Sequence, residues 1–121
     1  MQLEQRIVGN VAVLDLSGRL ILADGEELFR RNVDDLVRRG MVRVLVNFED
    51  VSYLDSAGVG VIVWKYVTLK RHGGALKLLH LKPRSHRVLA TTRLLTVLEN
   101  FDSENEALAS FDSGARPSVG R

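Results

Sequence analysis

The chain has 121 residues, of which 45% are apolar and 26% charged, and it contains no cysteine. This length predicts one domain with a core of its own. The lack of cysteine excludes disulfides, thiolate metal sites and cysteine nucleophiles, and it favours a reducing compartment. No apolar run approaches the roughly 20 residues of a membrane span, and the N-terminal residues do not resemble a signal peptide. We therefore expect a cytoplasmic protein without membrane contact.

The charge is nearly balanced, with 17 basic and 15 acidic residues and a net charge of +2. The basic residues are spread along the chain, whereas nucleic-acid-binding proteins usually gather them on one face, so we expect no direct contact with nucleic acid. His72, His80 and His86 lack the spacing of metal ligands, and no Ser/His/Asp set has a reason to assemble. The sequence thus predicts no metal, no cofactor and no catalytic residue.

Residues 6–18 predict two strands joined by a hairpin turn at Gly9-Asn10. Both faces of the second strand are largely apolar, which indicates a central position in a sheet. Asp15 interrupts this pattern, and two interpretations remain open: it is a buried acid or, more simply, it lies near a strand end facing water.

A helix is predicted over residues 22–40, with apolar residues at helical spacing on one face and acid–base pairs four residues apart on the other. Asp24 is the expected N-cap, because Glu27 follows three residues later as in a capping box. Gly40 is the expected end of this helix.

Strands and helices alternate through the rest of the chain. The prediction is a strand over 42–48, a loop over 49–54, a helix over 56–72, a strand over 75–81, a helix from Pro83, an ambiguous run over 94–101 and a helix over 103–111 capped by Ser103. Helices that follow strands cross over a sheet, so part of the sheet is expected to be parallel. The sequence predicts one α/β domain over 1–112, with a mixed sheet of four or five strands and helices mainly on one face. A disordered tail is expected over 113–121.

Ser56 stands where a helix is expected to begin, after Asp55 and before the small residues Ala57, Gly58 and Gly60. Ligands usually meet α/β sheets at such an edge, and the free N–H groups of a helix start favour phosphate. On the residues alone, two interpretations remain open. Asp55 or Ser56 is only an N-cap and the glycines only permit close packing, or the serine is a functional site. The two glycines are weak evidence for a nucleotide site, because no third glycine follows at the required position.

Two aromatic residues on the same predicted helix also have two interpretations. Trp64 and Tyr66 are most simply packing residues. If one of them is exposed beside Ser56, it would serve as an anchor in a protein interface.

At this point the chain resembles the STAS domain, specifically the anti-sigma-factor antagonists. The resemblance rests on "VLVNFEDVSYLDSAGVGVIV" at 44–63, "VLDLSGRL" at 13–20, "GGALKLLHLKPRSHRVL" at 73–89 and "FDSENEAL" at 101–108. Together these segments span roughly residues 5–111. The chain departs from the family pattern at Ala57, where many members have a second Ser or Thr, and at Arg93, where a glycine often ends a helix.

The resemblance implies a non-enzymatic switch. The serine after the motif's aspartate, here Ser56, would be phosphorylated by an anti-sigma factor with serine kinase activity, which supplies ATP and magnesium. The unphosphorylated chain would bind that kinase and free a sigma factor, and a phosphatase would reset the switch. The expected partner-binding residues are Leu20, Ile21, Leu22, Asp24, Ser56 and Val59. The alternatives are a structural or regulatory STAS module of a larger signalling or transporter assembly and, less strongly, a nucleotide-binding regulator.

Overall fold

The computed structural model describes residues 1–115, and their strands form one five-stranded sheet in the order β1-β2-β3-β4-β5. β1 and β2 are antiparallel, and every later pair is parallel. The strands are β1 (Gln2–Val8), β2 (Val11–Leu20), β3 (Arg43–Leu54), β4 (Ala75–Leu79) and β5 (Asn100–Phe101). The helical segments are α1 (Glu26–Arg38), α2 (Ser56–Arg71), α3 (Pro83–Thr91), the 3₁₀ turn η1 (Leu94–Thr96) and α4 (Glu104–Ala115). The predicted mixed α/β fold is confirmed.

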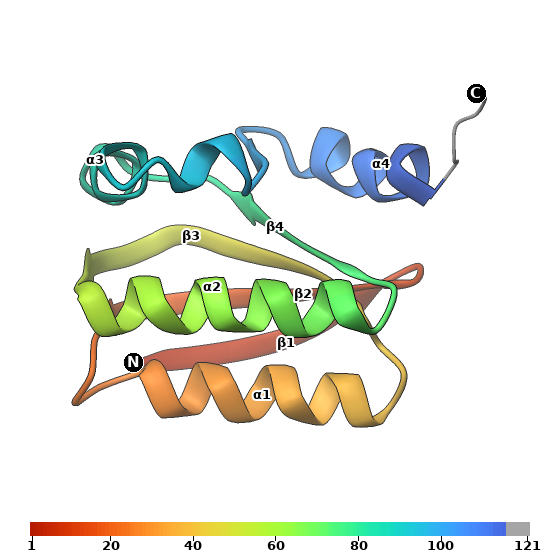
Figure 1. Ribbon diagram of the computed structural model, residues 1–121, viewed down its shortest axis with the longest axis horizontal. Helices are drawn as coiled ribbons and strands as arrows, with labels where there is room; N and C mark the ends of the chain where they lie inside the picture. The colour runs from red at the N-terminus through yellow and green to blue at the C-terminus, as the bar shows by residue number, and fades with distance from the viewer. Residues whose placement is uncertain (116–121) are drawn as a thin grey trace.

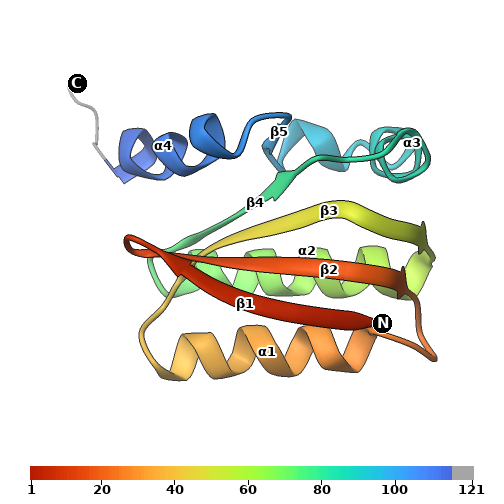
Figure 2. The same cartoon turned by 180° about the vertical axis from the view of Figure 1, so that it is seen from behind.

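The helices cover the two faces of the sheet unequally. Figure 1 shows α1 and α2 side by side in front of the strands, and Figure 2 shows the strands from the other side. The larger apolar cluster joins buried residues of α1, α2 and α3 to one face of the sheet, whereas α4 packs on the other face through Ala107 and Phe111. Three of the four α-helices therefore share one core, as predicted.

The side chains of β2 alternate between the two apolar clusters, which explains why this strand lies inside the sheet. Ala12, Leu14 and Leu16 enter the larger cluster, and Val11 and Val13 enter the smaller one. Because both faces of the strand are buried under helices, both must be apolar. The hairpin turn predicted at Gly9-Asn10 is also present, since Val8 pairs with Val11.

The expectation that Asp15 lies near a strand end and faces water is wrong. Asp15 is half-buried within β2, and its carboxylate accepts hydrogen bonds from the Arg6 Nε at 2.6 Å and the Asn47 Nδ2 at 2.8 Å. Burial acts to raise the pKa of Asp15, but the bonds from Arg6 and Asn47 outweigh it and lower the pKa below the usual value. Arg6 also binds Glu104, so this cluster ties β1 and β2 to α4.

Two predicted boundaries at the sheet edge are wrong. β3 does not stop at Phe48 but continues to Leu54, through the segment expected to be a loop. Its last residues pair with the 17–20 end of β2, with one register shift before Ser17 and another between Gly18 and Arg19. α1 begins at Glu26 with Gly25 as N-cap, and Asp24 instead pairs with the Met1 amino group and with Arg19.

The helix α4 runs to Ala115, past the domain end predicted at 112. Residues 116–121, which make up most of the predicted tail, lie outside the described residues.

Arg93 adopts the left-handed conformation, with φ 63° and ψ 17°, at the turn where the family often has glycine. Such a conformation costs a side-chain-bearing residue about 1 kcal/mol. We expect Arg93→Gly to raise the free energy of unfolding by about 0.5–1 kcal/mol, measured by urea denaturation. Arg87→Gly, at an exposed position inside α3, is the matched control and should lower it by about 1 kcal/mol. A loss of stability in both variants would contradict the strain at Arg93.

Candidate functional site

Ser56 is the first residue of α2, and its side chain is exposed at the edge of the sheet where β3 ends. The helix is capped by the preceding residue, because the Asp55 Oδ1 accepts a hydrogen bond from the Gly58 N–H at 2.9 Å. Within residues 1–115 the Ser56 hydroxyl makes no hydrogen bond of its own. The capping role therefore belongs to Asp55, and the Ser56 hydroxyl remains available for chemistry.

Asp55 connects two segments that are far apart in the sequence. Its second oxygen, Oδ2, accepts a hydrogen bond from the backbone N–H of Leu22 at 3.2 Å. The bond from Gly58 is the main cause that lowers the pKa of Asp55, and the bond from Leu22 adds to it. The carboxylate thus fixes the start of α2 against the turn that follows β2.

The two glycines of the motif have different structural roles. A Cβ added at Gly58 would lie 2.2 Å from the Leu20 carbonyl oxygen and 2.8 Å from the Leu54 Cδ1, so the helix start approaches β2 as closely as a bare backbone allows. A Cβ added at Gly60 would meet nothing within 4 Å. Ala57, which precedes Gly58, is half-buried and adds little bulk. Gly58 is required by packing, and Gly60 is not.

Some of the predicted partner-binding residues at the turn after β2 are exposed, and others are buried. The turn is closed by hydrogen bonds in both directions between the backbones of Ile21 and Asp24, at 2.9 and 3.1 Å. Leu22 at its tip is 72% exposed, whereas the Leu20 side chain is fully buried in the core and unavailable for contact. Ile21 and Asp24 are partly exposed, and Val59 is partly buried against the core.

An apolar hollow lies beside this turn, and the sequence did not predict it. Two adjoining pockets of about 340 and 450 Å³ share Gly60 and Trp64 in their lining. Leu22 lies at one end and Val67 and Arg71 at the other, and we call this surface the Trp64 groove. Trp64 is 69% exposed, so it is not a packing residue, whereas Tyr66 packs against the core.

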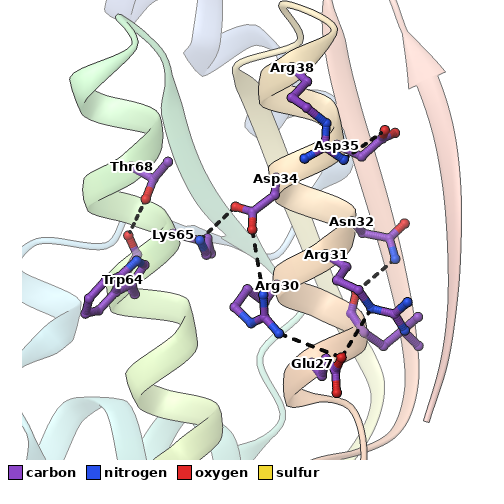
Figure 3. A network of polar contacts seen from close by, with 11 residues as sticks. Glu27, Arg30, Arg31, Asn32, Asp34, Asp35, Arg38, Trp64, Lys65 and Thr68 are labelled. Carbon is purple, nitrogen blue, oxygen red and sulfur yellow. Dashed lines mark hydrogen bonds and ion pairs between the residues drawn. The ribbon is translucent and has the colours of Figure 1, made fainter.

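A buried ion pair holds α2 against α1. The Lys65 side chain is buried, and Figure 3 shows it pointing to Asp34 on the neighbouring helix, with Nζ 2.8 Å from Oδ1. Arg30 lies 4.0 Å from the other oxygen of Asp34. The sequence signal for Lys65 was its place between Ile62 and Leu69 on the buried side of α2. This pair keeps the two helices that flank the Trp64 groove in a fixed relation.

The histidines do not assemble. Among residues 1–115, no group of three or more His, Cys, Asp or Glu side chains is placed to hold a metal ion. In the same part of the chain, no helix combines the length and the apolar character needed to cross a membrane.

Comparison with known proteins identifies relatives over nearly the whole chain. The anti-sigma F factor antagonist of Paenibacillus polymyxa is 26% identical, with 93% of this chain and 96% of that protein covered. A Thermotoga maritima structure superposes with a TM-score of 0.85 at 26% identity, covering 91% and 94% of the two chains. The Bacillus anti-sigma factor antagonist SpoIIAA shares the fold in two solved forms, each with a TM-score of 0.72. The unphosphorylated form is 23% identical, with 93% of this chain and 99% of SpoIIAA covered. The phosphorylated form is 24% identical, with 90% and 98% covered. The model of the STAS domain matches residues 2–107. This chain belongs to the STAS domain family.

Proposed function

We propose that this chain is an anti-sigma-factor antagonist that is switched by phosphorylation of Ser56. In the unphosphorylated state it binds an anti-sigma factor with serine kinase activity and so releases a sigma factor in the cytoplasm. The observation that carries the proposal is the exposed Ser56 hydroxyl at a helix start that Asp55 already caps. The relatives that are named anti-sigma factor antagonists support the partner class.

In this proposal the chain is a substrate and not a catalyst. The kinase brings ATP and magnesium, and the γ-phosphoryl group moves to the Ser56 Oγ while the hydroxyl proton leaves and ADP is released. A phosphatase transfers the same group to water and restores the hydroxyl. The first turn of α2 contains no acidic residue, and a helix N-terminus stabilises an anion, so the product is compatible with the folded chain.

The proposed contact surface combines the rim around Ser56 with the Trp64 groove. Leu22 and Trp64 are large, exposed and apolar, and exposed aromatic residues of this kind anchor protein interfaces. Ile21, Asp24 and Val59 supply smaller contacts around Ser56, and Leu20 supports the turn from inside without touching the partner.

Incubation with the cognate kinase and ATP is expected to add one phosphate to the chain, and Ser56→Ala is expected to abolish the addition. Intact-mass spectrometry measures the change. Ser52→Ala is the matched control, because Ser52 is an exposed serine of the same rim whose hydroxyl donates to the Gly18 carbonyl at 3.2 Å. It should be phosphorylated like the wild type. Phosphate on the Ser56→Ala variant would contradict the site. A wild-type chain that binds no kinase at all would favour the role of a structural module.

A further inference from the structure

A second polar site lies at the opposite end of α2 from Ser56. A small cavity of about 200 Å³ is lined by Arg43, Lys70, Lys77, Glu99 and the Gly73-Gly74 turn between α2 and β4. In Figure 1, α2 begins beside the end of β3, and this turn lies at the opposite end of the helix. The 16 residues of α2 separate it from Ser56 by about 24 Å, at 1.5 Å per residue. The cavity is therefore distinct from the proposed phosphorylation site.

The lining is cationic, and two of its cations have no anionic partner in the part of the chain that the structure describes. Among the described residues, neither Arg43 nor Lys70 forms an ion pair. Lys77 is 7% exposed, and its Nζ donates to the Ser110 carbonyl and hydroxyl at 3.0 and 2.9 Å and to the Glu99 Oε1 at 2.9 Å. Three positive groups against one carboxylate leave an excess of two positive charges around a small space.

Glu99 indicates what such a cavity accepts. Its carboxylate is a planar oxyanion of the chain itself, held on the buried ammonium of Lys77, yet the Glu99 side chain is 62% exposed. An exposed carboxylate on a flexible side chain is readily displaced, because water solvates it well when it leaves. A free anion that takes its place gains Lys77 together with Arg43 and Lys70, which Glu99 leaves unpaired.

We propose that this cavity binds a phosphate-sized oxyanion, either free phosphate or the phosphate end of a small metabolite. The volume is smaller than that of most ligand pockets, which suits a compact anion rather than a nucleotide. The N–H groups of Gly73 and Gly74 already bond to the Lys70 and Leu69 carbonyls, so recognition falls on the side chains. Lysine and arginine are the usual side-chain partners of phosphate.

The test is a titration of the wild-type chain with inorganic phosphate, monitored by ¹H–¹⁵N NMR. NaCl is adjusted at each step so that the ionic strength stays constant. We expect saturable shifts at the amides of Gly73, Gly74, Lys77 and Glu99. Lys70→Gln should weaken binding at least fivefold, and Glu99→Gln should tighten it because the competing carboxylate is gone. Arg87→Gln, an exposed arginine of α3, should leave binding unchanged.

Three results would overturn the proposal. They are shifts that only track ionic strength, shifts confined to residues 55–58, and equal affinity in the wild type, Lys70→Gln and Glu99→Gln. A parallel titration with glycerol 3-phosphate distinguishes the source of the anion, since tighter binding than phosphate identifies a phosphomonoester and equal binding identifies free phosphate. Ser56→Ala should keep full phosphate binding, so failure of the proposed switch and failure of this site are separable.

Discussion

Gly58→Ala is expected to lower the free energy of unfolding by about 3 kcal/mol. The added Cβ would stand 2.2 Å from the Leu20 carbonyl oxygen, which belongs to the backbone of the central strand β2 and cannot turn aside as a side chain would. The helix start would have to move away from the sheet, and overpacking of this kind typically costs 1–3 kcal/mol or somewhat more. Urea denaturation followed by circular dichroism measures the change.

Gly60→Ala is the matched control, two residues along the same helix. Its Cβ would meet nothing within 4 Å, and alanine is favoured over glycine inside a helix by roughly 0.5–1 kcal/mol. We therefore expect this variant to be more stable than the wild type. Equal stability of the wild type and Gly58→Ala would show that α2 does not lie against Leu20 as described.

Ser56→Asp is expected to weaken binding to the anti-sigma factor by at least 100-fold, which corresponds to about 2.7 kcal/mol. The new carboxylate would lie at the centre of the proposed contact surface, where binding would require the partner to desolvate a charged group. The fold should be unaffected, because Ser56 is exposed and the helix start tolerates an anion. Isothermal titration calorimetry gives the affinity, and the melting temperature should stay near that of the wild type.

Ser52→Asp provides the comparison for this result, because it adds the same charge to the same exposed rim three residues before Asp55. A small effect there and a large one at Ser56 would locate the switch. Wild-type affinity in the Ser56→Asp variant would refute it.

The order of strands and helices could be predicted from the sequence, because hydrophobic periodicity is a local signal. The apolar spacing in 56–72 with a cap at Asp55 or Ser56, and the cap at Ser103, predicted α2 and α4 close to their observed starts. The place of Ser56 at the start of α2 followed from the same local pattern. Its place at the rim needed only the rule that helices after parallel strands begin at one edge of the sheet.

The errors fall where a distant segment decides the local structure. Asp24 resembles an N-cap, but the Met1 amino group, 23 residues away, takes its carboxylate. The polar residues after Phe48 resemble a loop, but the end of β2 pairs with them and keeps them in β3. The ion pairs of Lys65 with Asp34 and of Lys77 with Glu99 could not be predicted either, because each joins residues far apart in the sequence. No local pattern contains those partners.

The bridging role of Asp55 bears on how fast a partner can engage. Its two oxygens hold the N–H groups of Gly58 and Leu22, so the rim on either side of Ser56 is ordered before any encounter. Loops that must order during association slow it and reduce its favourable free energy. With this carboxylate in place, we expect association with a partner to be governed by diffusion and orientation rather than by loop rearrangement.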